Sequence, residues 1–598
     1  MTPEQRLQVW QEAQTALDQQ DFANAEPRFS ALVQADEQDY AAQVNWGACM
    51  IRMGRLADAE LQTRLAIANG HRTSLMFQRM AQLLLALDRP VAERLAFARA
   101  FVEMLPDDPA AYVALAFAFR AEGDFAMSRK AWLRVLDKDP DHLLAAWAVF
   151  QYPESIVPAD AAAETAYLNQ FDAGLAAFAN RRFPEDGSLP RRALDALEST
   201  VPFHLAYQPG AHAERMAAYA KQLRRLALAA GLRDRPALSR APRSKPRVVV
   251  FSAHLHLHSV SRVWRELLIE SSKHCELIAV HASTISDGST DIWRAHSSQF
   301  IRGMRNTGQW SVTLHQLDPD VLIFLDIGME PGSAALASIR HAPRQYVTWA
   351  HPLTSGHLQI DGFLSSDAAE PADASANYVE PLVRLPGLAS SYRFPKVLPA
   401  PAPIPASDGE INIACVQIGY KLSPDQDATW AALLDLDPRI HLHFTPNLVP
   451  RGAAKLRARI DAALGPERSQ RVHWHPVMMF DDYLAHISRQ QLIIDTEHYS
   501  GGLTSADALS LGVPVVTIEG DTLRARQTAA MLRLLDVPEL IAPNRAGLLG
   551  VVQQLLSDPE AHAALRQRLA ATRPRLADFR HAVPAIRALL AGRIRSLN

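Results

Sequence analysis

The segment LIIDTEHYSGGLTSADALSLGVPVVTIEGDTLRARQTAA, residues 492–530, carries the pattern that decides the fold of the second half of the chain. The apolar run LII predicts a buried strand that ends at Asp495, and a glycine-rich loop follows it. A helix is predicted to start at Leu503, and VPVVTIEG predicts the next strand. Free N–H groups at such a helix start, together with the hydroxyls of Thr504 and Ser505, favour binding of a phosphate or diphosphate.

Similar strands and helices alternate along the chain from residue 245 onward. The Pro-rich stretch 394–410 divides them into two halves, 245–400 and 401–598. The alternation predicts two doubly wound, Rossmann-like domains with a ligand cleft at the carboxyl ends of both sheets. The predicted strands are 247–253, 275–282, 321–328, 344–350, 411–417, 440–446, 471–476, 492–498 and 513–520.

The first 150 residues contain helix pairs with a fixed period. Similar turn segments begin at Gln20, Gly54, Asp88 and Gly123. A period near 34 residues is typical of tetratricopeptide-like repeats, which bury their apolar faces only by stacking on one another. Unrelated helical hairpins are the simpler alternative. Residues 151–244 are also predicted to be helical but lack the period, and we interpret them as a connector.

Composition excludes several classes of protein. The chain has 598 residues and a formal net charge of -3, so it lacks the basic field that nucleic-acid binding requires. Its three isolated cysteines suit a reducing compartment and predict neither disulfides nor a thiolate metal cluster. No signal peptide and no apolar run long enough to span a bilayer is recognised, so we expect a cytoplasmic protein without membrane insertion.

Common enzyme motifs are absent from the sequence. It contains no GxGxxG after the first strand, no GxxxxGK[ST] and no GxSxG. The run HLHLH at 254–258 places three histidines at alternate positions, and His473 and His475 are two further candidates. Such pairs are able to chelate a metal, but no further ligand follows at a recognisable spacing. We therefore expect no metal and interpret the histidines as polar groups at strand ends.

The motif DT-x5-GLTSADAL-x-LGVPVVT-x3-DTLRAR within residues 495–526 resembles the nucleotide-sugar segment of glycosyltransferase family 41. This family includes the O-GlcNAc transferases with tetratricopeptide repeats and the bacterial adhesin N-glucosyltransferases. HSVSR (258–262), the stretch 342–367 and QIGYKLSP (417–424) match in the same order. The resemblance implies a GT-B fold behind the helical repeats, that is, an α plus α/β architecture.

The resemblance also implies roles for residues of the second half. Lys421 matches the lysine that contacts the diphosphate, where a fixed ammonium stabilises the charge on the leaving group without a metal. Asp507 matches the acid that holds the ribose hydroxyls, and Gln417 lies at a position near the uracil and the phosphate. The diphosphate-binding loop matches Gly501, Gly502, Thr504 and Ser505. The O-GlcNAc enzymes have histidine and threonine where this chain has Gly502 and Leu503, so backbone groups must supply contacts there.

In the first half, the resemblance implies a sugar and acceptor side. His258 and Arg262 lie in HSVSR, which is more similar to the N-glucosyltransferases than to the HPTSH of the O-GlcNAc type. His258 is predicted to order the acceptor or take its proton, although a structural role remains an alternative. His351, Thr354 and Ser355 in HPLTSG are predicted to face the donor sugar or the acceptor. Neither Asp326 nor Asp361 stands out as a general base, and the role of His475 stays open.

Together these features predict an inverting, metal-independent protein glycosyltransferase that uses a UDP-sugar. UDP-glucose and asparagine acceptors of a bacterial surface protein such as an adhesin are favoured by HSVSR. O-linked transfer of N-acetylglucosamine or another sugar to Ser or Thr, for example of flagellin, is the alternative. The repeats are expected to help bind the acceptor protein. An alternative from another class is a non-catalytic repeat scaffold with a remnant GT-B domain.

Overall fold

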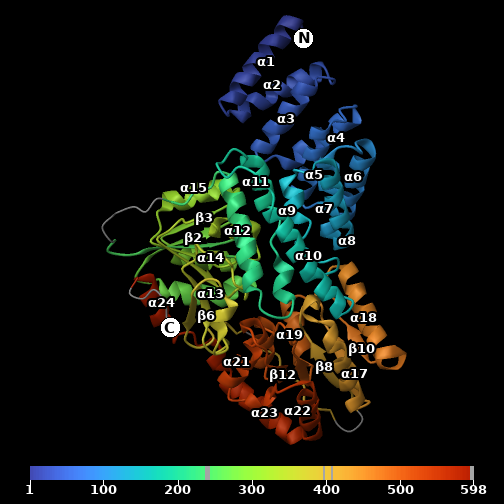
Figure 1. Cartoon of the computed structure of the whole chain (residues 1–598), viewed down its shortest axis with the longest axis vertical. Helices are drawn as coiled ribbons and strands as arrows, with labels where there is room; N and C mark the ends of the chain where they lie inside the picture. The colour runs from blue at the N-terminus through green and yellow to red at the C-terminus, as the bar shows by residue number, and fades with distance from the viewer. Residues whose placement is uncertain (236–242, 395–397, 406–408, 593–598) are drawn as a thin grey trace. The chain divides into compact units, whose positions relative to one another are not determined.

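The computed structural model describes the chain except for residues 236–242, 395–397, 406–408 and 593–598 (Figure 1). The chain divides into two compact units, Met1–Val149 and Phe150–Asn598. The first unit holds the segment predicted to form helical repeats. The second holds the connector segment and both α/β domains.

The first unit consists of antiparallel helix pairs followed by a short ninth helix. The second helices of the four pairs begin at Phe22, Leu56, Val91 and Phe125, in step with the predicted repeats. The helices are α1 Pro3–Asp18, α2 Phe22–Ala35, α3 Tyr40–Arg52, α4 Leu56–Ala68, α5 Ser74–Ala86, α6 Val91–Met104, α7 Pro109–Glu122, α8 Phe125–Lys138 and α9 Leu143–Ala148.

The turn inside each helix pair explains why the four turn segments align. Gln20, Gly54, Asp88 and Gly123 occupy equivalent turn positions, and all four have positive φ angles of 59°, 76°, 48° and 82°. Glycine adopts this left-handed conformation without steric cost, and other residues adopt it less readily. The period in the sequence therefore reports a repeated backbone turn, and the prediction of tetratricopeptide-like repeats is confirmed.

The first α/β domain of the second unit contains a seven-stranded sheet in the order β3-β2-β1-β4-β5-β6-β7, and neighbouring strands pair in parallel. Its strands are β1 Arg247–Ser252, β2 Glu276–His281, β3 Gln299–Arg302, β4 Val321–Phe324, β5 Arg344–Thr348, β6 Gly362–Ser366 and β7 Leu382–Leu385. Its helices are α13 Ser259–Ser271, α14 Gly288–His296, α15 Thr307–Leu317, α16 Pro331–Ala337 and the 3-10 turn η2 Ala374–Asn377.

The second α/β domain contains a six-stranded parallel sheet in the order β10-β9-β8-β11-β12-β13 (Figure 1, orange to red). Its strands are β8 Ile411–Cys415, β9 Ile440–Phe444, β10 Val472–Trp474, β11 Leu492–Ile494, β12 Val515–Ile518 and β13 Ile541–Ala542. Its helices are α17 Asp427–Leu436, α18 Pro450–Ser469, α19 Phe480–Ser488, α20 Leu503–Ser510, α21 Gln527–Leu534, α22 Arg545–Ser557, α23 Pro559–Thr572 and α24 Val583–Leu590. Short 3-10 turns are η3 Gly419–Lys421, η4 Pro424–Gln426, η5 Leu523–Ala525, η6 Pro538–Leu540 and η7 Arg573–Ala577.

Both sheets reverse their strand order at a central pair of strands. In the first sheet the chain moves outward from β1 to β3 and then returns to place β4 on the other side of β1. In the second sheet β11 lies on the other side of β8 in the same way. Ligands bind at the carboxyl ends of such strand pairs, so the fold places two candidate edges in this unit. The predicted GT-B architecture is confirmed.

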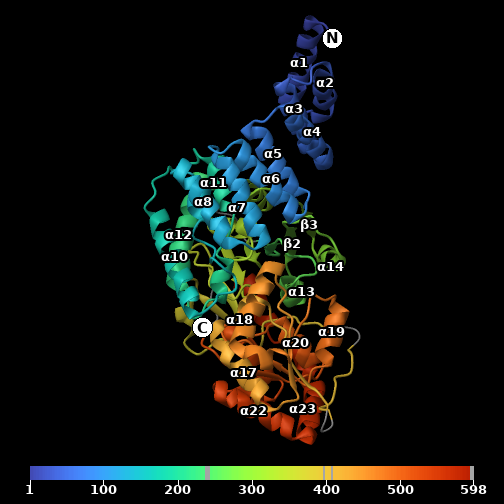
Figure 2. The same ribbon diagram turned by 90° about the vertical axis from the view of Figure 1, so that its right-hand side faces the viewer.

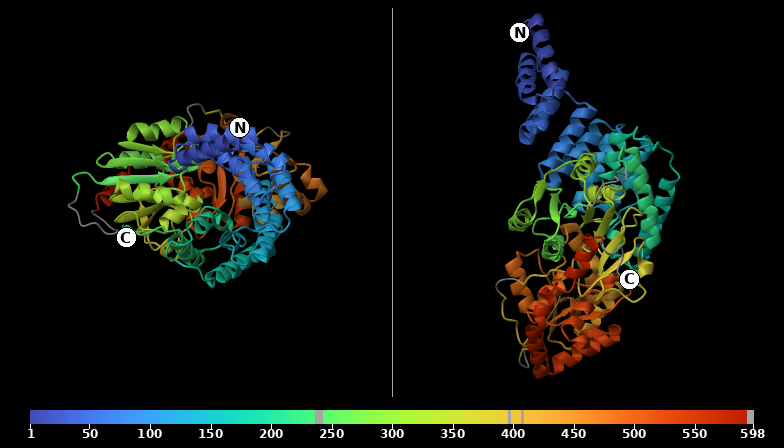
Figure 3. Two further views of the ribbon diagram at one scale, coloured as in Figure 1. Left: turned by 90° about the horizontal axis from the view of Figure 1, so that it is seen from above. Right: turned by 90° about the vertical axis from the view of Figure 1, so that its left-hand side faces the viewer.

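The connector segment is part of the second unit. It forms α10 Ala161–Ala179, α11 Pro190–Leu197, the 3-10 turn η1 Phe203–Tyr207 and α12 Ala213–Ala229. In Figure 3 these helices, in teal, lie against the first α/β domain, where α11 and α12 contact α16. Gly356 explains how close this packing is: its φ is +76°, and a Cβ there would lie 2.2 Å from the carbonyl oxygen of Met216 in α12.

The last helix returns to the first α/β domain. Helix α24 packs beside α13 (Figure 1), and the Arg344 side chain donates to the carbonyl oxygens of Leu589 and Leu590 at 2.7 and 3.2 Å. The two domains are thus tied together at a point remote in sequence from their linker. Within the described residues, no helix combines the length and apolar character needed to cross a membrane.

Candidate functional site

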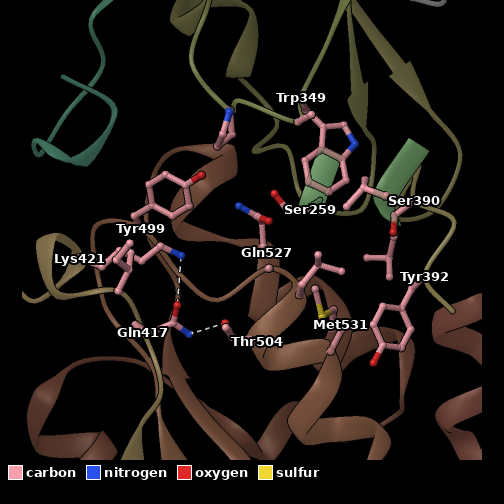
Figure 4. Close-up of a pocket in the computed structure, with 18 of the residues that line it drawn as sticks. Ser259, Trp349, Ser390, Tyr392, Gln417, Lys421, Tyr499, Thr504, Gln527 and Met531 are labelled. Atoms are coloured by element: carbon pink, nitrogen blue, oxygen red, sulfur yellow. Dashed lines mark hydrogen bonds between the residues drawn. The ribbon is translucent and has the colours of Figure 1, made fainter. Parts of the chain in front are cut away.

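A cavity of about 250 Å³ lies between the two α/β domains (Figure 4). The second domain contributes the carboxyl end of β8, the start of α20 and helix α21, and the first domain contributes the start of α13 and the loop after β5. The lining residues labelled in Figure 4 are Ser259, Trp349, Ser390, Tyr392, Gln417, Lys421, Tyr499, Thr504, Gln527 and Met531.

Lys421 is the cation of this cavity. Its ammonium group donates to the carbonyl oxygen of Ser500 at 2.9 Å and to Oε1 of Gln417 at 3.1 Å, and it lies 4.1 Å from the ring centre of Tyr499. Burial lowers the pKa of Lys421 to about 8, although the nearby carboxylate of Asp495 opposes this shift. The lysine therefore stays charged at neutral pH in a site where water screens its charge poorly.

Gln417 connects Lys421 to the start of helix α20. Its amide nitrogen donates to the Thr504 hydroxyl at 2.9 Å and to Oδ1 of Asp495 at 3.4 Å, while its oxygen accepts from Lys421. Gln417 is 1% exposed, so these contacts fix the side chain in one orientation. One buried amide thus sets the positions of a cation and a hydroxyl that both face the cavity.

Asp495 organises the glycine-rich loop beneath this network. Its carboxylate accepts from the backbone N–H of Gly501 at 2.7 Å and of Thr496 at 2.9 Å, and from the Thr517 hydroxyl at 2.9 Å. Burial raises the pKa of Asp495, an effect opposed by Thr528, Lys421 and the two N–H donors. The sequence analysis recognised Asp495 as a strand end only, and the signal for its role was its place directly after a buried strand.

The N-terminus of α20 opens into the cavity without a side-chain cap. The N-cap residue is Gly502, which has no side chain to accept hydrogen bonds from the first N–H groups of the helix. Gly502, Leu503 and Thr504 all line the cavity. Unsatisfied N–H groups and the helix dipole favour an anion at such an end. Lys421 and this helix end together make the cavity suited to a diphosphate.

The loop glycines are required by close packing. A Cβ on Gly501 would lie 2.5 Å from Nε2 of Gln417 and 2.0 Å from Oγ of Ser505, and a Cβ on Gly502 would lie 2.8 Å from Oε1 of Gln527. Gly501 therefore lets the loop approach Gln417, whereas Ser505 is buried and shares a 2.8 Å hydrogen bond with Thr528. Of the predicted diphosphate residues, Gln417, Lys421, Gly502 and Thr504 line the cavity, and Gly501 and Ser505 support them from below.

Asp507 and Arg262 meet each other between the two domains. The guanidinium of Arg262 donates to Oδ1 of Asp507 at 3.0 Å, and the Tyr392 hydroxyl donates to the same oxygen at 2.6 Å. Asp507 is 2% exposed, and neither it nor Arg262 lines the cavity. In this structure the predicted ribose-binding acid and the predicted acceptor-side arginine form a bridge that joins the domains.

His258 caps helix α13 at the carboxyl end of β1. Its Nδ1 accepts from the N–H of Val260 at 3.3 Å, and its ring stacks on His254 with centroids 4.0 Å apart. Burial, followed by the neighbouring histidines, lowers the pKa of His258 to about 3. Burial also acts to lower the pKa of His254, but Glu330 and Asp326 outweigh it and raise that pKa. His258 is thus a neutral imidazole directly before Ser259, which lines the cavity.

The predicted HPLTSG residues turn away from the cavity. His351 is buried against Phe203 with ring centroids 5.7 Å apart, and burial lowers its pKa to about 4. The Thr354 hydroxyl donates to Glu380 at 2.5 Å, and the Ser355 N–H donates to the same carboxylate at 2.8 Å. The neighbours Trp349, Ala350 and Pro352 line the cavity instead.

An aromatic wall completes the cavity and was not predicted. Tyr207 of the connector stacks on Tyr499 with centroids 5.0 Å apart and an interplanar angle of 13°, and Tyr420 lies 4.8 Å from Tyr207. The buried guanidinium of Arg524 donates to the carbonyl oxygen of Gln208 at 3.1 Å, which ties the connector to the second domain. No local pattern in the sequence marks Tyr207, because long-range packing of the connector brings it here.

Comparison with known proteins agrees with this geometry. Residues 408–582 match the family described as Glycosyl transferase family 41. This match confirms the resemblance inferred from the motifs. It covers the second α/β domain with Gln417, Lys421, Asp495 and the α20 loop.

Curated relatives and a solved structure extend the comparison. The chain is 29% identical over 257 residues to a Petunia hybrida protein named probable UDP-N-acetylglucosamine--peptide N-acetylglucosaminyltransferase SPINDLY, covering 42% of this chain and 27% of that protein. It is 27% identical over 157 residues to a Caenorhabditis elegans UDP-N-acetylglucosamine--peptide N-acetylglucosaminyltransferase, covering 25% of this chain and 13% of that protein. A solved Thermobaculum terrenum O-GlcNAc transferase mutant shares the fold over 93% of this chain and 96% of its own, with a TM-score of 0.66 and 20% identity. The chain thus spans about a quarter of the length of the first curated relative.

Proposed function

We propose that this protein is an inverting glycosyltransferase that moves a sugar from a UDP-sugar to a protein side chain. The observation that carries the proposal is the pairing of Lys421 with the uncapped end of α20 through Gln417. A departing nucleoside diphosphate accumulates negative charge, and a fixed ammonium and aligned N–H groups stabilise that charge. These groups supply that stabilisation from the chain itself, so we expect the chemical step to need no metal.

The donor and the linkage are the finer part of the proposal. The names of the curated relatives specify UDP-N-acetylglucosamine and peptide acceptors, and on that basis we favour O-linked N-acetylglucosamine. The segment HSVSR favours the alternative, UDP-glucose and asparagine, and His258 at the start of α13 is the residue to distinguish them. A neutral imidazole beside the cavity is suited to orient a hydroxyl or an amide acceptor.

The acceptor is a protein, and the helical repeats of the first unit are proposed to bind part of it. Stacked repeats of this kind present extended surfaces to peptides. A bacterial surface adhesin or a flagellin modified in the cytoplasm before export is the acceptor that fits the resemblance. A non-catalytic scaffold with a remnant GT-B domain is the competing proposal.

Two measurements test these statements. Calorimetric titration with UDP should show one site per chain, and the absence of binding at millimolar UDP would favour the scaffold. Full-length protein should then be incubated with candidate acceptors and either UDP-N-acetylglucosamine or UDP-glucose. Intact mass and peptide mapping of the acceptor identify the sugar and show whether Ser, Thr or Asn carries it. Donor hydrolysis without modification of any acceptor residue would contradict protein glycosylation.

A further inference from the structure

A second cluster of polar side chains lies on the edge of the second sheet, apart from the cavity. Strand β9 has the sequence IHLHF and β10 has VHW followed by His475, so histidines alternate with apolar residues on both strands. The strands are parallel with His473 opposite His443. Because alternate side chains of a strand share a face, the histidines of both strands project from one face of the sheet.

The imidazole rings on this face form two rungs. Nδ1 of His441 lies 2.9 Å from Nε2 of His473, and Nδ1 of His443 lies 2.9 Å from Nε2 of His475. Helix α19 adds His486 to the second rung only, with its ring centroid 4.3 Å from that of His475 and 5.9 Å from that of His443. One ring nitrogen from each of His443, His475 and His486 lies within 4.8 Å of the others.

The buried nitrogen Nε2 of His486 indicates that a ligand is absent from this cluster. His486 is 8% exposed, and within the described part of the chain this nitrogen has no hydrogen-bond partner. An unpaired buried polar atom is costly, so such an atom in a cluster of potential ligands calls for an explanation. Hydrogen bonding between the rings of β9 and β10 accounts for the arrangement of His443 and His475, but it does not account for the unpaired nitrogen of His486.

The hydrogen bonding of the cluster suits a metal ligand set. Nε2 of His443 lies 2.7 Å from Oδ1 of Asn412, which fixes the proton on Nε2 and leaves the lone pair on Nδ1 facing His475. Outer hydrogen bonds of this kind orient histidines that bind metals.

We propose that His443, His475 and His486 bind one divalent late transition-metal ion, with Zn²⁺ the preferred ion. Three neutral imidazoles and a water complete a tetrahedral Zn²⁺ site, whereas Mg²⁺ and Ca²⁺ require oxygen ligands. His443 binds through Nδ1 and keeps its proton on Nε2 toward Asn412. His475 binds through Nε2 and carries its proton on Nδ1, so the ion replaces the hydrogen bond between the two rings without net loss of a proton.

The role of this ion is to fix helix α19 to the sheet. None of the three histidines lines the cavity, so the ion takes no part in the transfer reaction. Helix α19 lies beside α20 (Figure 2), and its Phe480 ring packs 5.2 Å from the guanidinium carbon of Arg262. The ion therefore stabilises the helix that supports the Arg262–Asp507 bridge. This inference does not depend on the proposed transferase activity.

Direct metal binding tests the proposal on the untagged full-length protein. After treatment with EDTA and removal of the chelator, calorimetric titration with Zn²⁺ should give one site per chain. Co²⁺ should produce the intense visible bands of a tetrahedral nitrogen site, and Zn²⁺ should raise the melting temperature. A wild-type protein that binds neither ion, or that binds Co²⁺ with the weak bands of an octahedral site, overturns the proposal.

Matched variants locate the site. His486→Asn should weaken Zn²⁺ binding at least as much as loss of an outer partner does in known sites, about 10- to 100-fold. His441→Asn, on the rung that lacks a third histidine, should bind Zn²⁺ as the wild type does. Asn412→Ala should weaken binding with all three ligands still present, which separates a metal effect from misfolding. Equal losses in His441→Asn and His486→Asn, or no loss in either, would contradict the assignment. EDTA should lower the melting temperature and leave UDP binding measurable.

Discussion

The carboxyl edges of the two sheets have the same plan and different chemistry. In each sheet a buried aspartate follows the first strand placed after the reversal of strand order. Asp495 comes directly after β11, and Asp326 comes two residues after the end of β4. Each aspartate accepts hydrogen bonds from the neighbouring strand and loop, Asp326 from the Ser252 hydroxyl at the end of β1 at 2.9 Å and from the Ala253 N–H at 2.7 Å. Burial raises the pKa of both.

The groups near the two aspartates differ. Lys421 lies near Asp495, stays charged at neutral pH and lines the cavity. His254 lies near Asp326 and forms an ion pair with Glu330 at 3.1 Å, and the neutral His258 stacks on it. One edge thus offers positive charge to an anion, and the other offers imidazoles able to orient or accept a proton. In the proposed function the two edges serve the two sides of the transfer, and the predictions below are ordered by their expected effect on UDP affinity.

Replacing Lys421 by Ala should have the largest effect. Truncating one partner of a buried charge pair costs roughly 2–5 kcal/mol, so we expect UDP affinity to fall by about 30-fold or more and transfer to be lost. Calorimetry with UDP measures the change. Lys273→Ala, an exposed lysine of the first domain with 58% of its side chain accessible, is the matched control and should bind UDP normally. Wild-type affinity in Lys421→Ala with an intact fold would remove the diphosphate assignment.

The two aspartates provide the second test. Asp495→Asn keeps the Oδ1 acceptor of the Gly501 and Thr496 N–H groups. It removes the negative charge and replaces Oδ2, which accepts from the Thr517 hydroxyl, with an NH2 donor, and a buried polar group left unpaired costs about 1–3 kcal/mol. We therefore expect UDP affinity to fall by about 10- to 100-fold, together with a lower melting temperature. Asp326→Asn should lower stability to a similar degree without changing UDP affinity. Equal loss of UDP affinity in both variants would mean that the edges are not functionally distinct.

The pattern of the sequence was sufficient to predict most of the fold. Runs such as RVVVFS and ELIAVH are long, apolar and rich in Val and Ile, and the nine predicted strands all occur. The four additional strands are β3, β6, β7 and β13. Strand β13 has two residues, and β3 and β6 have the mixed sequences QFIR and GFLSS, so local hydrophobicity does not distinguish them from loops.

The candidate site was predicted best where its residues are close in sequence. Gln417, Lys421, Gly502 and Thr504 come from two short motifs, and all four line the cavity. Tyr207 reaches the cavity only through packing of the connector, which has no repeat and no motif. The polar loop residues Thr354 and Ser355 look equally suited to bind a ligand. The buried Glu380 instead accepts hydrogen bonds from the Thr354 hydroxyl and the Ser355 N–H. The sequence shows the type of a polar group and does not show which neighbour satisfies it.

The pH dependence of UDP binding should distinguish Lys421 from the imidazoles. A diphosphate beside the ammonium raises its pKa above the value of about 8 in the free protein, so the gain in affinity is complete below pH 8 and is lost as the pH rises through that value. We expect affinity to fall toward about tenfold per pH unit above pH 8, as measured by calorimetry.

Protein stability gives the control for that measurement. Burial holds the folded-state pKa of Lys421 below the value of 10.5 for a free lysine, so deprotonation between these values relieves a cost and does not unfold the protein. Loss of UDP affinity should therefore occur without loss of the fold. Lys421→Ala should show no such pH dependence. If the wild type instead loses affinity between pH 6 and 7 and is flat above, a histidine controls binding.

Replacing His258 should have the smallest effect on UDP affinity, and this variant tests the carboxyl edge of the first sheet alone. The ring lies on His254 and outside the cavity, so His258→Gln should change UDP affinity by less than about twofold. If the first edge serves the acceptor, the same variant should slow transfer, because a positioned proton acceptor contributes about 10²- to 10⁴-fold to such reactions. Glutamine retains an oxygen able to accept from the Val260 N–H that His258 caps, so the start of α13 should be preserved.

His274→Gln is the control, since this residue lies in the turn after α13, away from the edge. A variant that loses UDP affinity and transfer in parallel would place His258 on the donor side, and one that loses neither would give it a purely structural role.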